Sequence, residues 1–363
     1  MPAYITALTT TNPDYAISQS ETVKFMAKAY QLNELDEKKM RLFYRSAGID
    51  NRYSVIEDFR KENNFSFFNE IPAKFPTTQQ RMEMYEKSAI LLALKAFYQL
   101  KNRFEFQNDE ITHLITVSCT GMYAPGLDIE LIINANLPTT IHRTCINFMG
   151  CYAAFNAMKM AKSICEENKE HKVLIIGVEL CTLHLQPALS EDDWLANALF
   201  ADGAAALLIE GKKTKKSLEL KSFYADLAPQ AQKEMAWYIR DYGFMMKLSS
   251  YIPYLLGEKI KSITTKMFDK LGILSNQITH YALHPGGKKI IESLEKALQI
   301  EPSKNEYAYQ TLKNFGNMSS VTIWFVLEKF WYDDSFFEQE NKLLSMAFGP
   351  GLTLEAALLI PCQ

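Results

Sequence analysis

The sequence predicts an α/β fold made of two similar halves. Short apolar runs alternate with longer stretches in which apolar residues recur at spacings of three and four, as strands and helices do. The sequence also contains a weak internal repeat, because a strand leads into a glycine-flanked helix start near Gly150 and again near Gly286. No Pro- or Ser-rich linker separates the halves. We therefore expect residues 1–210 and 211–363 to pack as one unit.

The individual elements follow from apolar runs bounded by Gly, Pro or charged residues. Expected strands lie at 113–118, 171–180, 203–210 and 278–284, with a strand pair at 343–361. Expected helices lie at 79–101, 151–168, 252–271, 286–299 and 317–331. The basic stretch at 211–221 is expected to be a solvated turn that follows a strand.

Composition excludes several functional classes. The net charge of −3 gives no basic footprint for nucleic acid, and we expect no nucleic-acid partner. None of the six cysteines forms a CxxC pair, so a zinc site or a disulfide framework is not expected. No apolar run is long enough to span a bilayer, and the first residues lack the pattern of a signal peptide. We therefore expect a cytoplasmic protein without a membrane partner.

Cys151 stands at the start of an expected helix, directly after Gly150. A helix N-terminus directs its N–H groups and positive dipole end at such a sulfur, which favours a reactive thiolate. The alternative is a buried helical cysteine that serves only packing. This segment by itself leaves both interpretations open.

Two further residues stand at similar junctions. His284 ends an apolar run and precedes Pro-Gly-Gly, and sites in α/β sheets often lie where a strand gives way to a helix. Asn317 lies between Gly316 and Met318, again before an apolar helix. A structural histidine and a helix-capping asparagine are the alternative interpretations.

The strings "NFMGCYAA", "HPGGKKIIESLEKAL", "FGNMSS" and "AFGPGLTLE" occur in the order and spacing of the type III polyketide synthases. The chain resembles this chalcone synthase-like family from about residue 3 to residue 360. The resemblance implies the thiolase fold, with two similar halves in a five-layered αβαβα arrangement, and a homodimer. It also implies a catalytic trio of Cys151, His284 and Asn317.

The implied chemistry explains the need for these residue types. A thiolate of Cys151, paired with an imidazolium of His284, takes an acyl group from an acyl-CoA. His284 and Asn317 then stabilise the enolate formed when malonyl-CoA loses CO2. The enolate lengthens the chain, which cyclises to a pyrone, resorcinol or phloroglucinol type of product. Coenzyme A thioesters are substrates here, and no metal or permanently bound cofactor is expected.

The resemblance also implies residues along the substrate path. Phe200 and Met246 match the two gatekeeper positions between the CoA tunnel and the cavity, where Met replaces the usual Phe. Lys38, Arg41 and Arg45 match basic positions that hold CoA phosphates, although an exposed helix face is the alternative.

The cavity wall differs from that of the plant enzymes. The resemblance places four wall residues and one residue of the GNMSS motif in contact with substrate: Cys119, Cys181, His184, Trp237 and Ser319. Trp237 stands where a glycine permits a roomy cavity, so we expect few extensions or a cavity that runs in another direction. A tunnel for a fatty acyl tail is one such direction. Cys119, Cys181 and His184 could equally be plain core.

Two other functions remain open. One is a single condensation, as in the ketoacyl synthase III enzymes, which share the Cys-His-Asn logic. The other is a non-catalytic acyl-CoA-binding subunit of a heterodimer. An enzyme of the hydroxymethylglutaryl-CoA synthase type lacks support, because no candidate for its glutamate base is seen.

Overall fold

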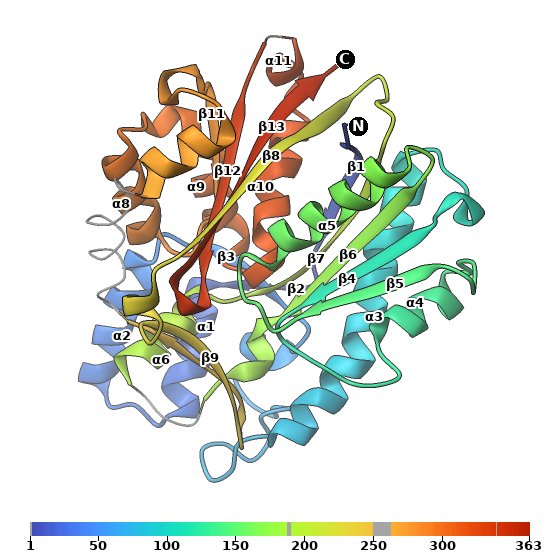
Figure 1. The fold of residues 1–363 in the computed structure, drawn as a ribbon. Coiled ribbons are helices and arrows are strands. Elements are labelled where there is room, and N and C mark those ends of the chain that lie inside the picture. The colour runs from blue at the N-terminus through green and yellow to red at the C-terminus, as the bar shows by residue number, and fades with distance from the viewer. Residues whose placement is uncertain (1, 187–189, 250–262, 339) are drawn as a thin grey trace.

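A computed structural model describes residues 2–186, 190–249, 263–338 and 340–363 of the chain (Figure 1). Its main sheet has nine strands in the order β11-β12-β13-β8-β1-β7-β6-β4-β5. The bounds of these strands are β1 Tyr4–Thr11, β4 His113–Ser118, β5 His142–Asn147, β6 Lys172–Leu180, β7 Asp202–Glu210, β8 Ser217–Leu227, β11 His280–Leu283, β12 Leu343–Gly349 and β13 Thr353–Cys362. Two small hairpins add β2 Tyr15–Ser18 with β3 Asn51–Ser54, and β9 Met235–Arg240 with β10 Gly243–Leu248.

The sheet divides into two arms where β1 meets β8. Only Tyr4 and Ile5 of β1 pair with β8, whereas β1 pairs with β7 along its whole length. One arm comprises β1, β7, β6, β4 and β5, and the other comprises β8, β13, β12 and β11. The two arms come from the two halves of the sequence.

Helices α5 (Ala153–Glu167) and α10 (Thr322–Trp331) form a layer between the arms. Helix α5 contacts β4, β6 and β7 of the first arm and also β8 and β13 of the second. Helix α10 contacts β1, β7 and β11, and it is apolar on nearly every side, as a helix enclosed by sheets must be. Trp324 at its centre is fully buried.

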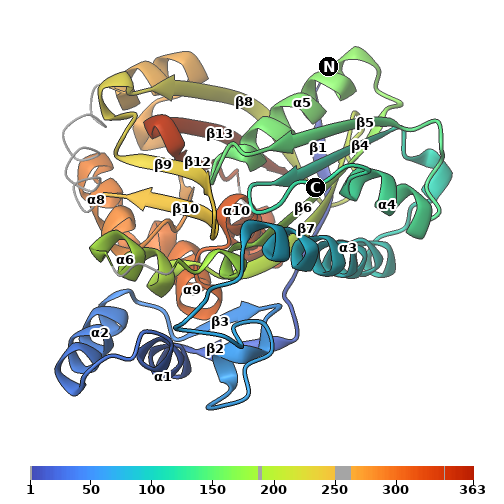
Figure 2. The same cartoon turned by 90° about the horizontal axis from the view of Figure 1, so that it is seen from below.

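Outer helices complete the layers (Figure 2). The long α3 (Thr78–Arg103) packs against β1, β6 and β7, and α4 (Leu127–Asn134) lies beside it. On the second arm, α9 (Glu306–Phe315) contacts β11, and α8 (Lys288–Leu298) packs beside α9. The order helix, sheet, helix, sheet, helix is the five-layered arrangement that the resemblance predicted.

The expected elements are confirmed where the structure describes them. The strands at 113–118, 171–180, 203–210 and 278–284 are β4, β6, β7 and β11, and 343–361 is the pair β12 and β13. The helices at 79–101, 151–168 and 286–299 are α3, α5 and α8, and 317–331 contains the short η7 (Ser319–Val321) followed by α10. Of the helix expected at 252–271, residues 252–262 lie outside the described residues, and 263–271 are helical.

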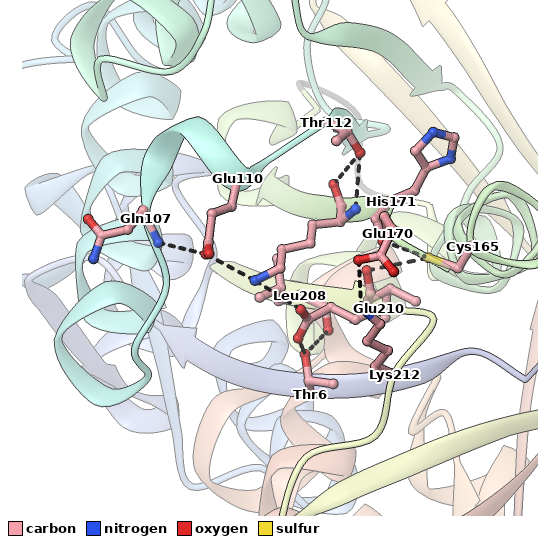
Figure 3. A network of polar contacts seen from close by, with 12 residues as sticks. Thr6, Gln107, Glu110, Thr112, Cys165, Glu170, His171, Leu208, Glu210 and Lys212 are labelled. Atoms are coloured by element: carbon pink, nitrogen blue, oxygen red, sulfur yellow. Dashed lines mark hydrogen bonds and ion pairs between the residues drawn. The ribbon is translucent and has the colours of Figure 1, made fainter. Parts of the chain in front are cut away.

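The expectation for 211–221 is correct only for its first part. Residues 211–216 form the turn, in which Lys212 pairs with Glu170 at 2.5 Å (Figure 3). From Ser217 onward the chain is strand β8, with Leu218 and Leu220 buried. The alternation of Leu with polar residues in this stretch is the period of a strand, and the lysines obscured it.

The N-terminal segment forms a lobe beside the gate region that we describe below (Figure 2). It contains α1 (Gln19–Ala29), α2 (Glu34–Ser46), the hairpin of β2 and β3, and the short η1 (Glu57–Arg60). The structure also describes α6 (Glu191–Leu199) and the one-turn α11 (Asp334–Phe337). In the described parts of the chain, no helix has both the length and the apolar character that crossing a membrane requires.

Candidate active site

A tight turn between β5 and α5 presents Cys151. Gly150 has a φ of +83°, a conformation that L side chains rarely adopt. A Cβ atom added to Gly150 would lie 2.3 Å from Cδ of Pro350, so the turn packs directly on the loop after β12. The proline of the string "AFGPG", Pro350, therefore packs against the turn that carries Cys151.

His284 follows β11, and its backbone fixes it to the neighbouring strand. Its N–H donates to the carbonyl of Met346 at 2.8 Å. The side chain is buried, and neither Nδ1 nor Nε2 has a hydrogen-bond partner within the described residues. Buried polar atoms usually have a hydrogen-bond partner, so the two unpartnered ring nitrogens of His284 indicate that a group from outside the protein forms hydrogen bonds with them.

Asn317 is held so that its amide nitrogen is available. Its Oδ1 accepts a hydrogen bond from the Ser319 N–H at 2.9 Å, which fixes the direction of the amide group. Its Nδ2 lies 3.4 Å from the carbonyl of Gly286, a long contact that leaves donor capacity. Asn317 does not cap α10, whose N-cap is Val321, so the capping alternative does not describe its position.

Cys151, His284 and Asn317 line one pocket. The other side chains around it include Phe200, Met235, Met246, Leu248 and Phe348. The structure therefore brings the three candidates together from the ends of β5 and β11 and from the segment before η7. Ser319 is adjacent, with its Oγ 4.0 Å from the sulfur of Cys151.

Burial favours the neutral forms of both the cysteine and the histidine. It raises the pKa of Cys151 to about 12, although hydrogen bonds from Ser319, from the backbone and from Asn317 oppose the rise. It lowers the pKa of His284 to about 3. The imidazolium expected from the sequence stays a prediction, whereas burial by itself favours an uncharged thiol and an uncharged imidazole, because each isolated charge loses its hydration.

A second pocket lies behind Phe200 and Met246, since these two residues line both pockets. Cys181, His184 and Trp237 line this second pocket, as expected for wall residues. Trp237 stands opposite Met246 in the β9–β10 hairpin.

Hydrogen bonds at both ring nitrogens hold His184 in the pocket wall as a neutral imidazole. Its Nε2 donates to the carbonyl of Thr120 at 2.8 Å, and its Nδ1 accepts from the Phe244 N–H at 3.0 Å. The ring also stacks on that of Phe244, with centroids 4.4 Å apart. Burial, aided by the nearby Arg81 cation, lowers the pKa of His184 to about 3.

Cys119 is placed differently from the other wall residues. Its sulfur accepts a hydrogen bond from the Gly150 N–H at 2.9 Å, and its carbonyl accepts one from Trp237 Nε1 at 2.8 Å. It lines neither of the two pockets described above. Cys119 thus lies beneath the turn that carries Cys151.

The basic residues of α2 are exposed. Lys38 and Arg45 point to solvent, and Arg41 pairs with Glu37 at 2.5 Å. Helix α2 lies near α6 (Figure 2), and the ring of Phe43 packs edge-on against that of Trp194. The exposed helix face that was the alternative interpretation is present, and α2 contacts α6, the helix that ends directly before Phe200.

Two residues near the site were missed in the sequence. Glu179 is fully buried and accepts from the Cys119 N–H at 2.9 Å, from Thr120 Oγ1 at 2.8 Å and from Ser320 Oγ. A carboxylate inside the apolar run "VLIIGVEL" was the available signal. Arg52 donates to the carbonyl of Phe200 at 2.6 Å, and nothing in its sequence surroundings indicated this.

No group of three or more His, Cys, Asp or Glu side chains in the described ranges is arranged to hold a metal ion.

Comparison with known proteins gives a consistent assignment. The family model for the N-terminal domain of chalcone and stilbene synthases matches residues 1–213, and that for the C-terminal domain matches residues 219–362.

Similar proteins come from distant organisms. The chain is 28% identical over 361 residues to the alpha-pyrone synthesis polyketide synthase-like Pks18 of Mycobacterium tuberculosis, covering 98% of this chain and 90% of that protein. It is 28% identical over 367 residues to type III polyketide synthase C of Arabidopsis thaliana, covering 98% and 94%. The crystal structure of PKS-I from the brown alga Ectocarpus siliculosus matches with a TM-score of 0.92 at 26% identity, covering 99% and 98% of the two chains. The type III domain of Steely1 from Dictyostelium, at 23% identity, shares the fold with a TM-score of 0.89 and coverage of 99% of both chains.

Proposed function

The chain belongs to the chalcone and stilbene synthase family, and from this premise we propose that Cys151, His284 and Asn317 are its catalytic residues. As a type III polyketide synthase it is an acyltransferase with the thiolase fold. Enzymes of this family use coenzyme A thioesters and need no permanently bound cofactor. The observation that carries the proposal is the single pocket lined by all three side chains.

Loading begins with a proton transfer. Because burial favours the neutral thiol and the neutral imidazole, His284 takes the proton of Cys151 as the acyl-CoA carbonyl approaches. The thiolate attacks that carbonyl, and the bond to the CoA sulfur breaks. The imidazolium returns its proton to the departing CoA thiolate. The pocket keeps a net charge of zero throughout this exchange, which limits the desolvation cost.

The extension step uses the hydrogen-bond donors of Asn317 and His284 that remain free in the pocket. Malonyl-CoA loses CO2, and the electron pair of the broken carbon–carbon bond passes to the thioester oxygen as an enolate. Asn317 Nδ2 and a ring N–H of His284 donate to that oxygen. The enolate carbon then attacks the acyl group on Cys151, and the carbon–sulfur bond breaks to release the Cys151 thiolate, which takes a proton from solvent to return to the neutral thiol. The free donor capacity of both side chains supports these roles.

Substrate would pass between Phe200 and Met246, and exposed Lys38, Arg41 and Arg45 would hold the CoA phosphates at the surface. Cys181, His184 and Trp237 would then form the wall of the cavity that receives the growing chain, with Ser319 beside the acyl sulfur. Support comes from the two pockets that share Phe200 and Met246. A thioether in place of a second ring makes this gate softer.

We propose an acyl-CoA starter and malonyl-CoA extender, with cyclisation to a pyrone, resorcinol or phloroglucinol type of product. A single condensation is the second candidate, and the indole of Trp237 in the second pocket favours it by filling space. Incubation with malonyl-CoA and a panel of acyl-CoAs, followed by mass spectrometry, separates the two. Two or more added two-carbon units support the first proposal, one unit supports the second, and the absence of both product and CO2 release contradicts both.

A homodimer and a division of the chain near residue 210 are also proposals. Strand β5 is the last strand of the sheet, and Met122 and Met149 nearby are 40% and 36% exposed, an arrangement that suits a second copy. Light scattering on the purified protein would show twice the chain mass if the proposal is correct and the chain mass if it is wrong.

A further inference from the structure

The second pocket continues beyond the gate towards the N-terminal lobe. Besides Phe200 and Met246, it is lined by Ile17 of β2, Met26 of α1 and Phe59 of η1. Phe59 also lines a separate hollow at the protein surface. Three hollows therefore follow one another, with Phe200 and Met246 shared by the first two and Phe59 shared by the last two.

Phe59 is a firm barrier between the second pocket and the surface hollow. Its ring lies 4.7 Å from that of Phe25 and 5.9 Å from that of Phe68, and only 6% of the residue is exposed. The preceding residue, Asp58, accepts backbone N–H bonds from Phe67 and Phe68, both at 2.8 Å. This local network fixes η1, so the ring cannot swing away without breaking buried contacts.

The two sides of Phe59 differ in polarity. On the inner side the surface of the second pocket is mostly apolar, with Met26, Leu185 and Phe244 in its wall, and Arg52, Asp193 and Asn197 also line it. On the outer side the hollow is lined by charged side chains: Glu21, Lys24, Lys28, Arg60, Lys61 and Glu62. The binding free energy of an alkyl chain becomes more favourable with each methylene buried up to Phe59. Beyond Phe59 it does not, because methylenes placed among these charged side chains would displace their water.

We propose that Phe59 sets the maximum length of the acyl chain that the enzyme accepts. This inference rests on the proposed function, in which the chain is attached to Cys151 and passes between Phe200 and Met246. The methyl end of a saturated acyl group then abuts Phe59. Each methylene that a closed apolar pocket cannot accommodate costs roughly 10- to 200-fold in specificity.

The test compares the wild type with Phe59→Ala and Phe59→Leu on a series of even-numbered saturated acyl-CoAs. We expect the wild-type kcat/KM to rise with chain length and then fall by at least about tenfold at the first chain that is too long. Phe59→Ala should raise kcat/KM for that chain by about tenfold or more, and Phe59→Leu should shift the limit less. Phe68→Leu is the matched control, because Phe68 belongs to the same aromatic cluster and lines none of the three hollows.

Calorimetric dissociation constants for the same acyl-CoAs provide a readout that does not depend on turnover. If the wild type turns over none of them, the proposed function fails, and the length dependence of binding still decides the role of Phe59. A length limit that is the same in the wild type and in both folded Phe59 variants overturns the inference. So does a limit that moves equally in Phe68→Leu.

Discussion

The main chains of Phe200 and Asn317 are paired in a short parallel bridge. The Asn317 N–H donates to the carbonyl of Leu199, and the Ala201 N–H donates to the carbonyl of Asn317, both at 2.9 Å. Arg52 holds the same segment through the carbonyl of Phe200. One set of backbone hydrogen bonds thus positions both the gate residue Phe200 and the amide of Asn317. A change that moves the backbone of Phe200 would therefore also move Asn317, whereas a change of the Phe200 side chain leaves these hydrogen bonds in place.

Asn317→Asp tests the amide donor. The carboxylate can still accept from the Ser319 N–H, but it cannot donate to an enolate and adds negative charge beside it. We expect malonyl-CoA decarboxylation to fall by about 100- to 1000-fold, while loading of the starter on Cys151 persists. CO2 release and intact-protein mass measure the two steps separately. Decarboxylation within a few-fold of the wild type would remove Asn317 from the mechanism.

Trp237→Ala tests the cavity wall. The change removes a large ring from the second pocket and the hydrogen bond from Nε1 to the carbonyl of Cys119. We expect the product distribution by mass spectrometry to shift towards chains with additional two-carbon units. Tyr238→Ala is the matched control, since Tyr238 follows on the same strand and is 38% exposed. An unchanged distribution in Trp237→Ala would show that this ring does not limit chain growth.

Much of the fold was predictable because apolar runs marked the buried strands. The strands β4, β6 and β7 are nearly continuous apolar sequence, as buried strands are, and α10 is apolar on nearly every side. The strand β8 was not recognised, because its alternating pattern begins inside a lysine-rich stretch. The lobe at 15–60 carries amphipathic helices and short strands, which give weak signals.

The site could be predicted in outline only. Cys151, His284 and Asn317 each stand beside glycine at a junction, and family motifs joined them into a trio whose catalytic role stays a prediction. The direction in which burial shifts the pKa values of Cys151 and His284 could not be predicted, because it depends on how fully the folded chain excludes water. Phe59 could not be found either, since its place between two hollows depends on packing across the lobe.

The loss of folding stability at acid pH should depend on the lowered pKa of His184. Its folded pKa is depressed to about 3, so below a pH of about 6.5 the unfolded chain binds a proton that the folded chain does not, and stability falls with falling pH. Urea denaturation between pH 6.5 and pH 5 should show that His184→Gln loses about 2 kcal/mol less stability than the wild type. His142→Gln, at an exposed histidine, is the control. Equal losses in the wild type and His184→Gln would mean that His184 titrates normally.

Alkylation should distinguish a neutral thiol from a preformed thiolate. With a pKa of about 12, Cys151 should react with iodoacetamide about tenfold faster for each unit of pH between about pH 7 and pH 10. Peptide mass spectrometry locates the label. A rate that is already constant near pH 7 would indicate a resting ion pair with His284, as the sequence suggested, in place of the neutral pair.

Transfer of an acyl group to a single sulfur is the step on which every other assignment depends. The most direct measurement is the mass of the intact protein after brief exposure to an acyl-CoA without malonyl-CoA, followed by peptide mapping. We expect a mass increase of one acyl group on the peptide that carries Cys151, and no increase in Cys151→Ala. An unmodified wild type across the acyl-CoA series, or an adduct that persists in Cys151→Ala, would contradict the account.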